Sequence, residues 1–124
     1  MNWVIALIVL AVLARGTLAL AVKPGVELST RPEMEVVRRA VERVWSAFGF
    51  RPTITSGMES ESIHKTQIHY EGLAEDYRTK DILPVSLKPI MFAQLRAILG
   101  SDYDVIFEDE GTPNEHLHVE YDPR

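Results

Sequence analysis

The chain has 124 residues, of which 46% are hydrophobic and 25% are charged, and this balance is typical of one small globular domain. The formal net charge is −5, and no run of Lys and Arg forms a basic stripe, so we expect no nucleic-acid partner. The absence of cysteine excludes disulfides, thiolate metal sites and cysteine nucleophiles.

The N-terminal segment Met1–Val22 is almost entirely apolar. Its uninterrupted apolar run, Trp3–Ala14, is too short to span a hydrocarbon core of ~30 Å, which takes about 20 residues. This length is typical of a signal-peptide core, and Ala19–Ala21 offers a small-x-small cleavage site. The alternative is an uncleaved membrane anchor with Arg15 near one interface. Both interpretations predict export, either to the periplasm, to the medium or to the outer face of the membrane. Both leave residues 23–124 as the functional domain.

A helix is predicted between Thr30 and Gly49. Thr30 and Glu33 have the spacing of a capping box, and Pro32 suits a first helical turn. Apolar residues then recur at the spacing of one buried helical face, namely Met34, Val37, Val41, Val44, Trp45 and Phe48. The opposite face is predicted to be solvated and carries Arg38, Arg39, Glu42 and Arg43.

A second helix is predicted from Ser86, a candidate cap, to Gly100, with Pro89 in its first turn. Its predicted apolar face consists of Ile90, Met91, Leu95, Ile98 and Leu99. Strands are predicted at 52–56, 103–108 and 116–121, and residues 68–76 are predicted to form a loop that leads into a further strand. The order of these elements predicts an α+β domain, with a small and mainly antiparallel sheet and two helices on one of its faces.

The first stretch of chemical interest reads H-x-x-G-x-A-x-D, from His69 through Gly72 and Ala74 to Asp76. A straight strand would hold His69 and Asp76 about 23 Å apart and on opposite faces. The two side chains can share a metal ion only if the chain bends between them, and Gly72 is the residue best able to bend it. An ordinary histidine–carboxylate hydrogen bond is the simpler alternative.

The second stretch reads Glu115-His116-Leu117-His118. Residues two apart project from the same side of a strand, so His116 and His118 would face one site. A regular strand would point Glu115 away from that site, and only irregular backbone at the strand start would turn it back. A catalytic zinc site needs three protein ligands, an open position for water, and a carboxylate near that water. Exposed polar positions on an edge strand are the simpler alternative for both histidines.

Together the two stretches resemble the signatures of the LAS zinc metallopeptidases. This superfamily includes D-alanyl-D-alanine carboxypeptidases and dipeptidases, phage L-alanyl-D-glutamate endolysins and the hedgehog signalling domain. The resemblance extends from about Arg31 to Asp122, and it implies a hedgehog or D-Ala-D-Ala peptidase-like fold.

The resemblance also implies a role for each site residue. His69, Asp76 and His118 would bind one zinc ion. Glu115 would be the general base that deprotonates a zinc-activated water, and His116 would donate a hydrogen bond to the developing oxyanion. The implied reaction is hydrolysis of a peptide bond next to a D-amino acid in peptidoglycan stem peptides, by carboxypeptidase or endopeptidase action.

The sequence departs from the superfamily at two places. Gln67 occupies the position of the serine that usually precedes the first histidine. The segment after Thr53–Ser56 lacks the arginine that assists the scissile carbonyl, so another basic residue such as Arg78 would have to replace it. A catalytically inactive, zinc-bearing hedgehog-like binding domain is therefore the alternative function.

Two further interpretations concern the polar segment before the first histidine motif. Glu59 and Glu61, together with Asp81, could form a calcium site like that of hedgehog domains. His64 is interpreted as a loop residue that lines the cleft rather than as a ligand.

Overall fold

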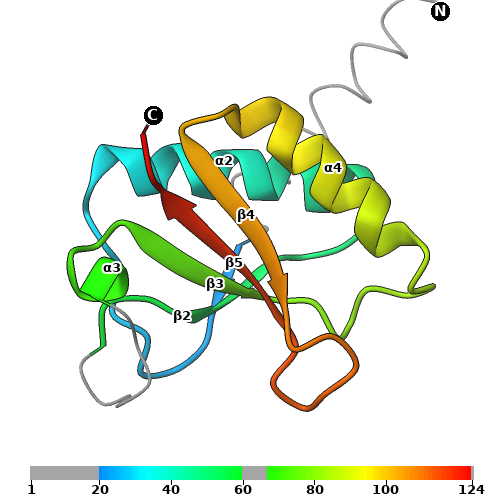
Figure 1. Ribbon diagram of the computed structural model, residues 1–124. Coiled ribbons are helices and arrows are strands. Elements are labelled where there is room, and N and C mark those ends of the chain that lie inside the picture. Colours follow the sequence, from blue (N-terminus) through cyan, green and yellow to red (C-terminus); the bar gives the residue numbers. More distant parts are fainter. Residues whose placement is uncertain (1–19, 60–66, 124) are drawn as a thin grey trace, which may run out of the picture.

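The computed structural model describes residues 20–59 and 67–123, and in these residues it shows an α+β fold (Figure 1). A five-stranded sheet has the order β1-β2-β3-β5-β4, with only β1 and β2 parallel. The strands are β1 (Ala21–Val22), β2 (Thr53–Ser56), β3 (Ala74–Arg78), β4 (Tyr103–Glu108) and β5 (His116–Tyr121). The helices are α2 (Pro32–Ala47), α3 (Gln67–Tyr70) and α4 (Leu87–Leu99). The predicted α+β class and mainly antiparallel sheet are confirmed.

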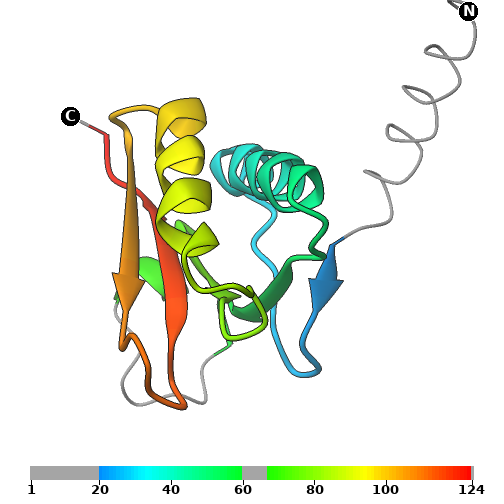
Figure 2. The same cartoon turned by 90° about the vertical axis from the view of Figure 1, so that its right-hand side faces the viewer.

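The two long helices α2 and α4 pack on the same face of the sheet (Figure 2). Trp45 of α2 anchors this core, with its ring centroid 6.4 Å from that of Tyr77 and 6.1 Å from that of Phe92. Leu117 and Val119 of β5 are fully buried in the same core. Because side chains alternate along a strand, the residues between them, such as His118, lie on the face without helices.

Helix α2 differs from its prediction at two points. It begins at Pro32, with Arg31 at the cap position and no side-chain capping bond, so the capping box predicted for Thr30 is wrong. Arg38 does not lie on a solvated face: its side chain is 14% exposed and forms an ion pair with the buried carboxylate of Glu75. The sequence alone does not show that a carboxylate of β3 lies beneath this arginine.

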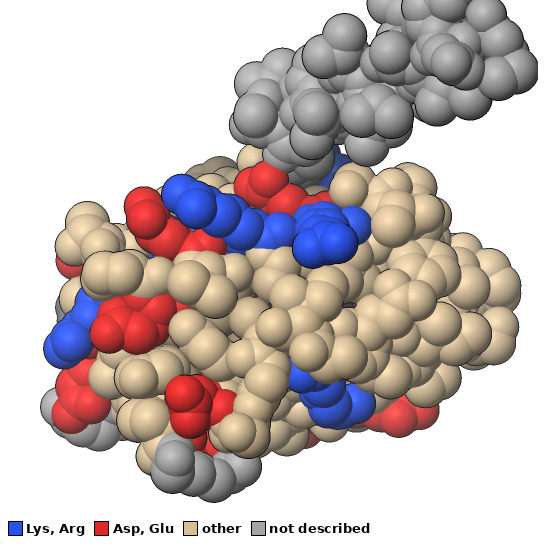
Figure 3. All heavy atoms as spheres, turned by 90° about the horizontal axis from the view of Figure 1, so that it is seen from above, with Lys and Arg blue, Asp and Glu red and all other residues tan. Residues whose placement is uncertain are grey.

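The buried face of helix α4 differs from the predicted face at two of its five residues. Ile90 and Ile98 are 49% and 45% exposed, whereas Phe92 and Lys88 are buried. Figure 3 views the helix-covered side of the molecule, on which side chains of both charges are mixed with uncharged surface.

The last two residues of the apolar N-terminal segment belong to the sheet. Ala21 donates its backbone N–H to the carbonyl oxygen of Pro52 at 2.8 Å, and Lys23 donates to that of Ile54 at 2.9 Å. Residues 1–19 of the predicted signal peptide or anchor lie outside the described residues. Within the described part of the chain, no helix has the length and apolar character needed to cross a membrane.

Candidate metal centre

The bend predicted at Gly72 is present and positions the first histidine. Gly72 has φ +75°, and its N–H donates to the carbonyl oxygen of His69 at 3.0 Å, which closes the turn between α3 and β3. Ser29 donates its hydroxyl hydrogen to the carbonyl oxygen of Gly72 at 2.7 Å. A Cβ atom on Gly72 would lie 2.6 Å from Ser29 Oγ, so the site requires glycine for both its backbone conformation and its close packing. The turn carries His69 back over β3.

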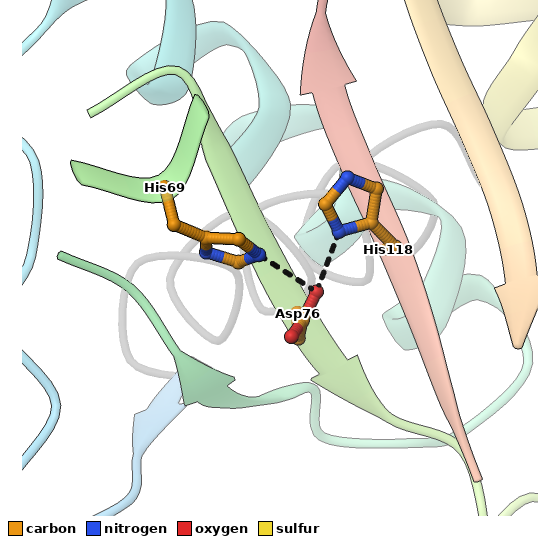
Figure 4. A group of neighbouring side chains, drawn as sticks. All are labelled: His69, Asp76 and His118. Carbon is orange, nitrogen blue, oxygen red and sulfur yellow. Dashed lines mark hydrogen bonds and ion pairs between the residues drawn. The ribbon is translucent and has the colours of Figure 1, made fainter. Parts of the chain in front are cut away.

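The three ligand candidates meet on the face of the sheet without helices (Figure 4). His118 of β5 is the direct cross-strand partner of Asp76 of β3, and its Nδ1 lies 2.9 Å from Asp76 Oδ1. His69, at the end of α3, places its Nε2 3.5 Å from the same oxygen. One ligand atom from each residue lies within 4.8 Å of the other two, so the group is close enough to bind a metal ion.

Outer contacts orient both imidazole rings for metal binding. His69 Nδ1 lies 3.1 Å from the carbonyl oxygen of Gly57, which can only accept, so this nitrogen carries the hydrogen. His118 Nε2 lies 2.9 Å from Glu120 Oε1 and donates to it. The lone pairs of the neutral rings are therefore on His69 Nε2 and His118 Nδ1, the two nitrogens that face Asp76. A metal site typically has outer contacts of this kind, and the chemistry of the donor set fits a metal ion.

On His118, a proton competes with a metal ion for the lone pair of Nδ1. Burial alone would raise the pKa of Asp76, but hydrogen bonds from His118 and His69 hold it well below its usual range. Burial would likewise lower the pKa of His118, but the carboxylates of Asp76 and Glu120 raise it to about 9. Metal binding must displace this proton, so metal affinity is expected to rise with pH through neutrality.

His116 lies beside the three ligand candidates, on the same face as His118, as predicted. Its Nδ1 donates to the carbonyl oxygen of Asn114 at 2.7 Å. Its Nε2 lies 3.9 Å from Asp76 Oδ2 and 3.4 Å from Glu108 Oε1. His116 therefore borders the site without belonging to the group of three.

The carboxylate of Glu115 is directed toward helix α4. It accepts hydrogen bonds from Lys88 Nζ at 2.8 Å, from the backbone N–H of Gly111 at 3.0 Å, and from the hydroxyl of Thr79. Burial alone would raise the pKa of Glu115, but these donors lower it to about 2. The residue borders the cavity, yet its carboxylate is already paired with the buried ammonium of Lys88.

The candidate metal centre opens into a cavity of about 810 Å³. Besides the site residues, its lining includes three cationic side chains, from Lys23, Arg78 and Lys80. Arg78 is two residues beyond Asp76 on β3, so both side chains lie on the same face. The cavity therefore combines a candidate metal centre with positive charge that could hold an anionic group.

The outer contacts of the histidines are not among the features predicted from the sequence. Glu120 follows His118 by two residues on one strand, and this spacing could have indicated the pair. The carbonyl of Gly57 carries no such signal, because it contacts a residue 12 positions away in the sequence.

The calcium prediction stays untested, because Glu61 lies outside the described residues, as does His64. Glu59 accepts hydrogen bonds from the backbone N–H groups of Gly57 and Glu27. Among the described residues, a second group close enough to bind a metal ion consists of Asp104, Glu120 and Asp122.

Glu120→Ala is expected to lower zinc affinity by about 10- to 100-fold, because the loss of an outer carboxylate frees the His118 ring. Calorimetric titration of the metal-free protein measures this change, and Glu71→Ala, at an exposed carboxylate, is the control. Equal affinities in the two variants would contradict the orienting role of Glu120.

Comparison with protein-family models, curated proteins and solved structures finds no match for the chain. Membership of the LAS superfamily therefore stays a prediction from the two motifs. The capacity of the site to bind a metal ion follows from the geometry of His69, Asp76 and His118.

Proposed function

We propose that this protein is an exported zinc-dependent peptidase that hydrolyses peptide bonds next to D-amino acids in peptidoglycan stem peptides. The supporting observation is that two imidazole lone pairs and one carboxylate oxygen converge, with the ring orientations fixed from outside. Two histidines and an aspartate suit Zn²⁺ in a catalytic site, which leaves its fourth position to water.

His69, Asp76 and His118 would hold the zinc ion, which when bound supplies a Lewis acid that polarises water and the scissile carbonyl. His116 would stabilise negative charge on the carbonyl oxygen by donating a hydrogen bond from Nε2. Because its Nδ1 already carries a hydrogen, the ring needs a second proton for this role. The carboxylates of Asp76 and Glu108, at 3.9 and 3.4 Å from Nε2, are the counter-charges for that proton.

The cationic lining of the cavity supports a substrate that carries carboxylates, as peptidoglycan stem peptides do. Lys23, Arg78 and Lys80 are available to pair with such groups. Arg78 lies on the same strand face as Asp76 and offers the positive charge that the superfamily supplies from an arginine elsewhere in its sequence.

Digestion of purified peptidoglycan by the zinc-loaded protein tests the function. We expect new peptide fragments in the mass spectrum, and we expect none with His118→Ala or after zinc is removed by a chelator. Stoichiometric zinc without any new fragment would contradict peptidase activity.

A zinc-bearing binding domain without catalysis is the second candidate. The observation that favours it is the orientation of Glu115, whose carboxylate pairs with Lys88 instead of facing the ligand group. This candidate predicts that the zinc-loaded protein binds stem peptides and releases them uncut.

A further inference from the structure

The strand register places a carboxylate next to the candidate metal centre that the two motifs do not include. His116 of β5 is the direct partner of Arg78 on β3 and of Glu108 on β4. Directly paired residues project from the same face of a sheet, so these three side chains form a row across the sheet. The adjacent row on this face contains Asp76 and His118. Glu108 therefore lies one row along the strands from two of the candidate ligands.

Glu108 contacts the site but is not one of the three ligand candidates. Its Oε1 lies 3.4 Å from His116 Nε2 and 3.9 Å from His118 Nδ1, the nitrogen that faces Asp76. Its side chain is 44% exposed and lines the cavity. A carboxylate at this position can reach both a water held at the ligand atoms and a peptide in the cavity, because general bases act over hydrogen-bond distances or through one water.

The carboxylate of Glu115 is directed away from the ligand group, although the residue borders the cavity. Alternation along the chain groups it with Leu117, which faces the helices, and its carboxylate accordingly reaches Lys88 of α4. Two further donors, from Thr79 and Gly111, also bind its carboxylate oxygens. Turning it toward the ligand group would leave the ammonium of Lys88 buried without a counter-charge.

We propose that Glu108, rather than Glu115, is the catalytic carboxylate of this peptidase, an assignment that rests on the proposed function. The oxygen of the attacking water forms a bond to the carbonyl carbon, and the water leaves one proton on Glu108. The carbon–nitrogen bond then breaks, and Glu108 returns that proton to the leaving nitrogen, so the carboxylate is regenerated. Replacement of such a group typically lowers kcat by about 10²- to 10⁴-fold.

Three glutamine variants of the full chain test the assignment in the peptidoglycan digest: Glu108→Gln, Glu115→Gln, and Glu110→Gln as a matched control in the exposed β4–β5 turn. Glu108→Gln is expected to lower kcat by at least about 100-fold. Its zinc Kd should stay within about threefold of the wild-type value and its Tm should be unchanged, because Glu108 is neither a ligand nor buried. Glu115→Gln is expected to lower Tm, and its folded fraction should lose less than about tenfold in kcat.

Each other result overturns the assignment in a distinguishable way. If the wild type cuts peptides and Glu108→Gln keeps its rate, only the assignment of Glu108 fails. A large loss of kcat in Glu115→Gln at unchanged Tm, with Glu108→Gln active, would return the role to Glu115. If the wild type binds zinc and cuts no peptide, the proposed function fails and the assignment fails with it.

Discussion

Lys88→Met is expected to lower the free energy of unfolding by about 3–5 kcal/mol, the usual cost of removing one partner from a buried ion pair. The side chains of Lys88 and Glu115 are 8% and 5% exposed, and 2.8 Å separates Nζ from Oε2. Methionine keeps most of the volume of the lysine side chain but removes its ammonium, which pairs with Glu115 and lies 5.8 Å from the centroid of the Phe107 ring, so most of the loss would report the unpaired carboxylate. Urea denaturation at neutral pH measures the change.

Lys80→Met is the matched control, because the ammonium of Lys80 is exposed and donates to the carbonyl oxygen of Pro113 instead of to a buried carboxylate. We expect this variant to change the free energy of unfolding by less than about 1 kcal/mol, as is usual for surface positions. An equally small change in Lys88→Met would contradict the buried pair between Lys88 and Glu115.

The same pair gives stability a defined pH dependence. The pKa of Glu115 is about 2 in the folded protein, below the ordinary value of 4.5. A carboxyl group whose pKa is lowered by folding contributes stability above its unfolded pKa and loses that contribution as the pH falls through its folded pKa. The destabilisation by Lys88→Met should therefore be largest above about pH 5 and shrink toward about pH 2. A difference from the wild type that stays constant over this range would contradict the pairing.

His118→Ala is expected to lower zinc affinity by more than the 10- to 100-fold attributed to an outer contact, because it removes a ligand atom. The wild type should gain about 2.7 kcal/mol of stability at a zinc concentration 100 times its Kd. The variant should gain less than about 0.4 kcal/mol at the same concentration. Thermal unfolding with and without zinc measures this gain.

His116→Gln is the control for the ligand variant, because His116 is not one of the three ligand candidates and its ring nitrogens lie nearer to Asn114 and Glu108 than to Asp76. We expect it to retain the stabilisation by zinc while lowering peptide hydrolysis. Loss of zinc stabilisation in His116→Gln, with retention in His118→Ala, would exchange the roles of the two histidines.

Local sequence patterns were sufficient to predict much of the fold. The apolar spacing in α2 and the alternation in β4 and β5 each follow from the period of a single element. The bend at Gly72 was predictable because His69 and Asp76 could meet only if the chain turned there. The common face of His116 and His118 followed from strand geometry alone.

Features that depend on contacts distant in sequence were not predictable. Lys88 is buried together with its partner Glu115, which is 27 residues away in the sequence. Arg38 is mostly buried against Glu75, which is 37 residues away. The proximity of Glu108 to the ligand group depends on the register of β4 against β5, which the spacing of the motifs does not contain. The charge pattern of α2 therefore predicted a solvated side chain for Arg38, which the fold pairs with Glu75.

A crystal structure of the protein grown with zinc, with anomalous data at the zinc edge, tests the central claim most directly. We expect one anomalous peak about 2.0–2.2 Å from His69 Nε2, Asp76 Oδ1 and His118 Nδ1. A peak at Asp104, Glu120 and Asp122 instead, or no peak at the three predicted ligands, would contradict the account.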